Sequence, residues 1–220
     1  MGIRCLTTPR ARTVIPKTRR RKRWSWSGYY EKTGRGMAWG TLREAVHLFE
    51  TKSSPNAERL AIDLGCGAGR DTFYLLRRGW KVLAIDNQRE AIRRVRSNVH
   101  SKDRPRLGTR IASFERTSLP KCDLVNASYS LPFCSPKHFK SVWSKIVTSI
   151  RPGGRFAGHL FGTNDEWASL SDMTFHSRRQ TASLLRNFRI EEFQEKEWEG
   201  TTSSGRKKHW HVISVVARKL

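Results

Sequence analysis

The stretch that decides the fold is 61–71, which reads Ala-Ile-Asp-Leu-Gly-Cys-Gly-Ala-Gly-Arg-Asp. An apolar run leads to an acid, Asp63, and three glycines then stand at alternate positions, Gly65, Gly67 and Gly69. Glycine has no Cβ, so it adopts positive φ without steric cost and lets backbone approach a ligand closely. A helical pattern follows directly. The stretch therefore predicts a strand, a glycine-rich turn and the start of a helix.

A second strand and a second acid follow that helix. Residues 81–85 read Lys-Val-Leu-Ala-Ile and lead to Asp86. Strand, glycine turn, helix, strand and acid form a βαβ nucleotide-binding unit in which Asp86 is placed to accept from ribose hydroxyls. The spacing acid-x-G-x-G-x-G differs from the dinucleotide pattern G-x-G-x-x-G. The alternatives are a Rossmann-like nicotinamide domain and a glycine turn that binds nothing.

The segment from Asp63 to Gly69 resembles motif I of the class I S-adenosylmethionine (SAM)-dependent methyltransferases, and Asp86 matches that family's ribose-binding acid. The resemblance implies SAM as cofactor, with the loop against its methionine part and Asp63 on its ammonium, directly or through water. After the third strand this chain has Ser113-Phe114-Glu115 where the family often has an acid for the adenine amino group. The cofactor-binding residues implied are Asp63, Gly65, Cys66, Gly67, Gly69, Asp86, Ser113, Phe114 and Asn126.

The rest of the chain alternates between strand and helix patterns. We expect strands at 59–64, 81–85, near 108–113, 123–128 and 155–161, with the turn Arg151-Pro-Gly-Gly154 before the last, and helices at 41–49, 70–78, 88–99 and 136–150. Strands this apolar indicate a parallel sheet with helices on both faces.

The C-terminal end differs in kind. After a helix over 175–186, strands at 188–197 and 209–216 are joined by a loop too short for a crossover helix, so they must be antiparallel. The whole pattern resembles the class I methyltransferase fold: α/β, Rossmann-like and seven-stranded, mostly parallel with a C-terminal antiparallel hairpin.

Within that family, the segments Asn126 to Phe133, Arg151 to Gly154 and Lys208 to His211 resemble a bacterial group related to tellurite-resistance and thiopurine-type enzymes. Ligands of open α/β sheets bind at the carboxyl ends of the strands, which puts Ser128 and Tyr129 beside the transferring methyl group. Two tyrosines near the N-terminus, Tyr29 and Tyr30, either close over cofactor or substrate or pack in the core.

The net charge of +24 is the second large signal. Residues 1–23 are rich in Arg and Lys and contain no acid, so we expect a disordered basic arm. Residues 24–220 are expected to form a single methyltransferase domain, with a helix-and-loop cap (24–55) over the mouth of the sheet and an α/β core (56–220). Such a charge attracts polyanions and anionic small molecules.

Three functions are compatible with this sequence. The first is methyl transfer from SAM to a small-molecule acceptor; the second is RNA or DNA methylation, with residues 10–23 as an electrostatic anchor. Asn126-Ala-Ser-Tyr129 keeps the ends of the Asn-Pro-Pro-Tyr turn of amino-methylating enzymes and lacks both prolines. A non-catalytic nucleic-acid-binding protein is the third, and the intact glycine loop with Asp86 argues against it.

Other chemistry is less clearly indicated. Methyl transfer needs orientation more than any particular side chain, so no catalytic residue is assigned. The four cysteines lack a C-x-x-C pair, and no run of about 18 apolar residues is present. We therefore expect reduced thiols, a cytoplasmic protein and no membrane partner. The histidines, including His209 and His211, lack the spacing of a zinc site, so no metal is expected. The oligomeric state cannot be read from the sequence.

Overall fold

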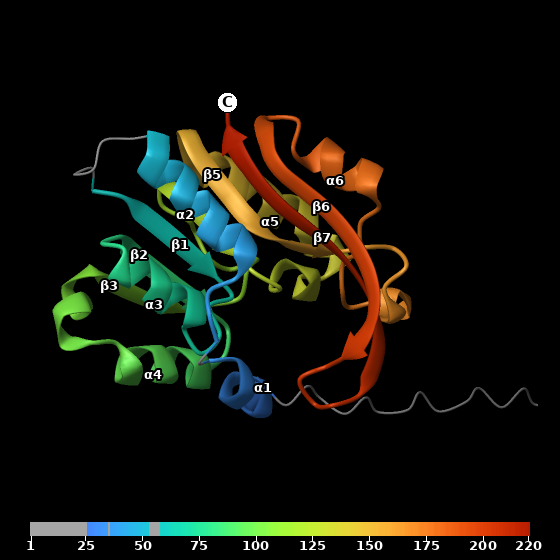
Figure 1. Ribbon diagram of the computed structural model, residues 1–220, viewed down its shortest axis with the longest axis horizontal. Helices are drawn as coiled ribbons and strands as arrows, with labels where there is room; N and C mark the ends of the chain where they lie inside the picture. Colours follow the sequence, from blue (N-terminus) through green and yellow to red (C-terminus); the bar gives the residue numbers. More distant parts are fainter. Residues whose placement is uncertain (1–25, 35, 53–57) are drawn as a thin grey trace, which may run out of the picture.

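The computed structural model describes residues 26–34, 36–52 and 58–220; the basic arm expected at 1–23 lies outside them. One seven-stranded sheet has the order β3-β2-β1-β4-β5-β7-β6 (Figure 1). Its first five strands pair in parallel, and β7 is antiparallel to both neighbours. The expected fold is confirmed. The strands are β1 (Leu60–Leu64), β2 (Lys81–Asp86), β3 (Leu107–Ile111), β4 (Cys122–Ala127), β5 (Ile150–Phe161), β6 (Phe188–Thr201) and β7 (Lys207–Lys219).

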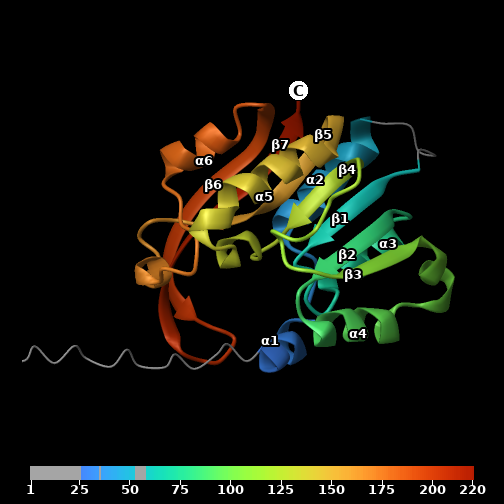
Figure 2. The same cartoon turned by 180° about the vertical axis from the view of Figure 1, so that it is seen from behind.

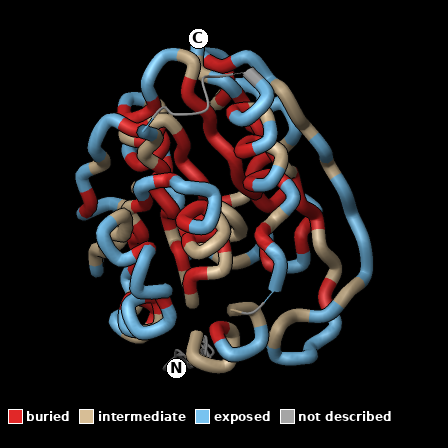
Figure 3. Tube along the Cα trace, turned by 60° about the vertical axis from the view of Figure 1, so that its left-hand side comes forward, coloured by how far each residue is buried: buried red, intermediate tan, exposed pale blue. Residues whose placement is uncertain are grey.

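Helices cover both faces of the sheet (Figures 1 and 2). Side chains alternate along each strand, so Ala61 packs toward α2 and α3 whereas Ile62 packs toward α5. Figure 3 shows the buried residues concentrated in the strands and on the inner helix faces. The helices are α1 (Trp26–Thr33), α2 (Gly40–Lys52), α3 (Arg70–Arg77), α4 (Arg89–Asn98), α5 (Pro136–Ser149) and α6 (Arg178–Leu184), with short 3-10 helices η1 (Ser101–Arg106), η2 (Leu131–Phe133) and η3 (Glu166–Ser169). In these described parts, no helix has the length and apolarity needed to span a bilayer.

The N-terminal helices differ from the expected cap. The helix predicted over 41–49 is α2, and it packs on the sheet with Leu42, Ala45 and Val46 fully buried rather than lying over the mouth. The mouth is instead bordered by α1 (Figure 1), whose residues have no periodic apolar pattern. α1 bridges α4 and the hairpin tip: Ser27 Oγ donates to Glu90 (3.1 Å) and Lys32 Nζ donates to the Ser203 carbonyl (2.8 Å).

Two strand boundaries also differ. Pairing of β6 with β7 continues from Phe188–Lys219 to Thr201–Lys207, so the hairpin is longer than expected. Cross-strand stacking of Trp198 on Trp210, with ring centroids 6.0 Å apart, extends the paired region beyond the apolar pattern. The turn expected at 151–154 is a bulge inside β5, between the pairs Cys122–Ile150 and Leu124–Arg155.

Candidate functional site

The glycine turn between β1 and α3 borders a small cavity. Gly67 has φ 53° and faces this cavity; a Cβ there would lie 3.4 Å from the Tyr30 ring. Gly69 has a different role, because a Cβ on it would meet the Phe73 ring at 2.8 Å and Val95 at 3.0 Å. The first glycine keeps space for a ligand, and the second lets α3 and α4 pack closely.

Two buried carboxylates lie beneath the turn. The Asn126 amide donates to both, at 2.9 Å to Asp63 Oδ1 and 2.9 Å to Asp71 Oδ2. The Thr72 hydroxyl donates to Asp63 (2.6 Å), and the Trp39 backbone N–H donates to Asp71 (3.1 Å). Asn126 itself is fully buried. It therefore orients the two carboxylates and does not line the cavity.

Burial sets the electrostatics of this site. It raises the pKa of Asp63, and the charge of Asp71 raises it further. Burial likewise raises the pKa of Asp71 and of Asp86. The charged residues lining the cavity, among those described, are Asp63, Asp71 and Arg70, whose guanidinium lies 4.4 Å above the Trp39 ring. Acids that are costly to ionise in isolation are stabilised by a positively charged ligand.

Asp86 connects the loop, the second strand and α1. It accepts from the backbone N–H of Gly67 (3.0 Å) and of Gln88 (2.8 Å), and from the Tyr30 hydroxyl. The cavity measures about 40 Å³, whereas small-molecule sites span about 300–1,000 Å³. Tyr30, buried over Gly67, fills much of this space. A ligand seated on the loop would therefore require α1 to shift.

The structure brings together part of the expected site. Cys66 is buried beside the cavity, and burial raises its thiol pKa, so it is protonated. Ser113 and Phe114 follow β3; the Ser113 carbonyl accepts from two backbone N–H groups, and Phe114 packs against the core. Neither lines the cavity. The expected residues that do line it are Tyr29, Asp63, Gly65, Cys66, Gly67 and Ser128.

Six further cavity residues were missed from the sequence: Thr33, Gly34, Trp39, Ala68, Arg70 and Asp71. Arg70 and Asp71 follow the glycine motif directly, and an acid on the inner face of the next helix is a usable signal for a buried role. Trp39 carries no such signal, because it reaches the cavity only through the packing of the segment before α2.

An aromatic stack stands next to the cavity, at the carboxyl ends of β4 and β5. Tyr129 has φ 53° and is the one non-glycine residue with positive φ in the described part of the chain. Its ring stacks on His159, with centroids 4.0 Å apart, and lies 4.4 Å from Trp39. His159 is 4% exposed, and burial lowers its pKa to about 3, so its imidazole is neutral.

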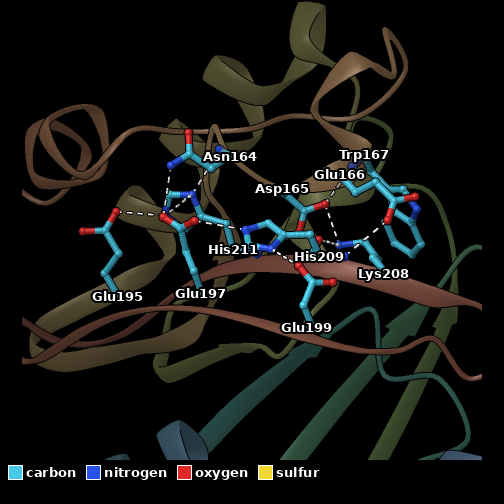
Figure 4. Close-up of polar contacts among 10 residues, drawn as sticks. All are labelled: Asn164, Asp165, Glu166, Trp167, Glu195, Glu197, Glu199, Lys208, His209 and His211. Carbon is cyan, nitrogen blue, oxygen red and sulfur yellow. Dashed lines mark hydrogen bonds and ion pairs between the residues drawn. The ribbon is translucent and has the colours of Figure 1, made fainter.

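A second polar cluster lies on the hairpin, away from the glycine turn (Figure 4). Lys208 is fully buried and pairs with both oxygens of Asp165, at 2.6 and 2.5 Å. His209 faces two carboxylates of β6, through Nδ1 to Glu199 (2.6 Å) and Nε2 to Glu197 (3.0 Å). Its two ring nitrogens point to different carboxylates. This cluster is therefore a cross-strand hydrogen-bond ladder that ties η3 to the hairpin.

Comparison with known proteins finds similarity to methyltransferases and related SAM-derived enzymes. A family model for a methyltransferase domain matches residues 61–154. The chain is similar to the carboxy-S-adenosyl-L-methionine synthase of Shewanella sediminis, with 27% identity over 127 residues that cover 55% of this chain and 50% of that protein. It thus spans about half the length of the curated relatives it matches.

Solved structures agree on the architecture. TehB from Haemophilus influenzae superposes with a TM-score of 0.71 at 16% identity, over 87% of this chain and 66% of that one. The 1,6-didemethyltoxoflavin-N1-methyltransferase of Burkholderia thailandensis, solved with its substrate and S-adenosylhomocysteine, gives 0.60 at 19% identity, over 82% and 78%. At sequence identities this low, the superpositions establish the fold alone.

The strand order, the glycine turn and the domain match define a class of protein with a nucleoside cofactor on its first βαβ unit. The chain has the fold of the class I SAM-dependent methyltransferases, and residues 61–154 match a methyltransferase-domain model. The residues present fit S-adenosyl-L-methionine, because Gly67 lines the cavity without a side chain of its own and Asp63, Asp71 and Asp86 supply acceptors for its ammonium and hydroxyl groups. The finer resemblance to tellurite-resistance and thiopurine-type enzymes stays a prediction.

Proposed function

We propose that this protein transfers the methyl group of SAM to a small-molecule acceptor. The observation that carries the proposal is the glycine turn, where Gly67 lines a cavity together with Asp63 and Asp71 and donates its backbone N–H to Asp86. In an otherwise strongly basic chain, a cavity with two lining acids and a third beside it suits a ligand that carries positive charge.

Each group has a role in this proposal. Asp86 accepts from the ribose hydroxyls, as its position at the end of β2 suggests. The paired carboxylates of Asp63 and Asp71 bind the ammonium and stabilise the positive charge of the cofactor. Arg70 makes no hydrogen bond or ion pair with the other described residues, so its guanidinium is available for the carboxylate of the methionine part.

When bound, SAM would supply an electrophilic methyl group on a positively charged sulfur, with neutral S-adenosylhomocysteine as the leaving group. The chain's own residues orient the two partners and exclude water from between them. Tyr29, Trp39 and Tyr129 provide apolar surface for that purpose. We assign no general base.

A small acceptor is favoured by how closely this region is enclosed. Helix α1 is tied to the hairpin tip through Lys32 and to α4 through Ser27. The ring of Trp26 packs edge-on to Phe133, with centroids 5.0 Å apart. A narrow aromatic opening admits a compact molecule more readily than a duplex. The Burkholderia methyltransferase with this fold is named for such a small molecule.

RNA or DNA methylation is the second candidate, and the net charge of +24 favours it. The arm that would anchor nucleic acid, residues 10–23, lies outside the described residues.

For the location of the protein, we propose the cytoplasm, because Cys66, Cys122 and Cys134 are free thiols, as a reducing compartment favours.

The proposal is tested by labelled methyl transfer from SAM into a cell extract, divided by size and by nuclease treatment. We expect label in the small-molecule fraction and no effect of nuclease. Label confined to nuclease-sensitive material would replace the first candidate with the second.

Cofactor binding is tested separately by calorimetry with the Asp86→Ala variant. Loss of a charge-assisted hydrogen bond should weaken SAM binding by about 1–3 kcal/mol. Glu58→Gln, which alters an exposed carboxylate paired with Lys81, is the matched control and should leave the affinity unchanged. Wild-type affinity in Asp86→Ala would overturn the ribose assignment.

A further inference from the structure

His159 lies in β5, opposite Ser214 of β7, and is almost completely buried. Its Nδ1 has no hydrogen-bond partner. A buried imidazole nitrogen without a partner is costly, because it has lost its hydrogen bonds to water and gained none in return. Such a group in a folded protein calls for a partner that is not part of the fold itself.

A second unfavourable feature lies next to the imidazole ring of His159. Tyr129 stacks on His159 with an interplanar angle of 19° and holds a positive φ, which side chains with a Cβ rarely adopt. Strained backbone persists only where the surrounding structure enforces it, and it gathers at ligand sites. The two unfavourable features are therefore adjacent, at the carboxyl ends of neighbouring parallel strands.

This position adjoins the cofactor cavity. Ser128, next to Tyr129 in the chain, lines that cavity, and so does Trp39, whose ring contacts both Tyr129 and His159. Open α/β sheets bind their ligands at this edge. A molecule that approaches the cofactor from this side is the methyl acceptor.

The surroundings of His159 indicate the acceptor's chemistry. Burial lowers the pKa of His159 to about 3, so its imidazole is neutral at pH 7. The contacting rings are Tyr129 and Trp39, which favour a flat, uncharged partner. A neutral imidazole is a hydrogen-bond partner for an N–H or O–H group, and it is too weak a base here to hold a proton at neutral pH.

Building on the proposed function, we propose that His159 binds the methyl acceptor through Nδ1, and that this acceptor is an uncharged aromatic or heteroaromatic molecule with an N–H or O–H group. The acceptor lies at the edge of the His159 ring, because the hydrogen bond of Nδ1 lies in the plane of the imidazole. Tyr129 and Trp39 stack on the acceptor, and the hydrogen bond to His159 fixes which of its atoms faces the cofactor.

The test uses the full chain saturated with S-adenosylhomocysteine, with phenol, indole and cyclohexanol as probes. Calorimetry with S-adenosylhomocysteine comes first, since failure there would contradict the proposed function itself. We then expect phenol and indole to bind in the millimolar range and cyclohexanol, which has the hydroxyl without the flat ring, to bind at least tenfold more weakly.

Two variants test the contribution of the His159 Nδ1 hydrogen bond to phenol binding. His159→Asn retains a polar atom near the position of Nδ1 and should keep phenol binding within about threefold. His159→Phe retains a stacking ring and should lose at least tenfold, with S-adenosylhomocysteine affinity unchanged in both. Equal phenol affinity in His159→Phe and wild type, or equal binding of cyclohexanol and phenol, would overturn the inference while leaving the proposed function intact.

A measurement on the wild-type protein covers the case in which a variant misfolds. In a sample with ¹⁵N-labelled histidine, titration with phenol should shift the Nδ1 resonance of His159 and leave in place that of His176, whose ring packs on Phe139. No phenol binding, or binding without a shift at His159, would also reject the proposal.

Discussion

At the scale of single residues, the cofactor site depends on which groups donate hydrogen bonds to its carboxylates. Asp86 accepts from two backbone N–H groups and also interacts with the Tyr30 hydroxyl. The backbone donors are fixed by the loop and by the start of α4. The tyrosine belongs to α1, and ribose hydroxyls that bind Asp86 as proposed would compete with it.

Tyr30→Phe should therefore tighten SAM binding. Removing the competing hydroxyl takes away a hydrogen bond to a charged group, worth about 1.5 kcal/mol or more, which corresponds to about tenfold in affinity. Calorimetry measures the change, with Tyr74→Phe on α3 as the control. Weaker binding in Tyr30→Phe would show that this hydroxyl contacts the cofactor directly.

His176 gives the stability a dependence on pH. Burial lowers its pKa from the ordinary value of 6.5 to about 4. Between these two pH values the unfolded chain therefore binds a proton that the folded chain does not bind. Its contribution is complete above pH 6.5 and is lost as the pH falls toward 4. Relative to His176→Gln, the wild type should lose about 1–2 kcal/mol between pH 7 and pH 5. Urea unfolding at both values measures this; an equal difference at the two values would contradict it.

At the scale of elements, the long hairpin is anchored by a buried ion pair. Lys208 and Asp165 are fully buried, and the ammonium lies 3.7 Å from the centre of the Trp210 ring. Asp165 also accepts from the backbone N–H of Trp167 (3.0 Å) and of His211 (3.2 Å). Its oxygens are thus satisfied from both η3 and β7, which fixes the hairpin to the segment after β5.

Truncating one partner of this pair should be severe. Asp165→Ala leaves a buried ammonium without its counter-ion and should lower the free energy of unfolding by about 3–5 kcal/mol. Glu166→Ala breaks the neighbouring, exposed pair with Arg206 and removes an acceptor of the His209 backbone N–H, and it should cost much less. Chemical denaturation of the two variants measures both. Similar losses would mean that burial of the first pair contributes nothing.

At the scale of the whole molecule, the charge of +24 acts over long distances. Counterion release predicts that affinity for a random-sequence RNA falls steeply as salt rises, and that deleting residues 1–23 makes this dependence shallower. The same deletion should leave SAM binding unchanged, because the cofactor site lies within the described domain. Filter binding across a salt series measures the slope; an unchanged slope would assign the RNA contacts to the folded part.

Much of the fold could be predicted because it is encoded locally. Alternating apolar runs and helical stripes indicate the parallel sheet, and the spacing of Gly65, Gly67 and Gly69 indicates the turn. The start of β5 and the length of the hairpin were harder to predict. A bulge such as 151–154 has the composition of a turn, and the extension of β6 depends on Trp198 meeting Trp210 across the strands.

The sequence by itself determined the βαβ unit, its acid Asp86 and the antiparallel ending, because glycine spacing, apolar periodicity and loop length act over short stretches of chain. Only the tertiary structure decided that Trp39, Tyr129 and His159 meet beside the cofactor cavity, and that Tyr30 reaches Asp86. Those residues come from separate elements, and their contacts exist only after helices and strands have packed into layers.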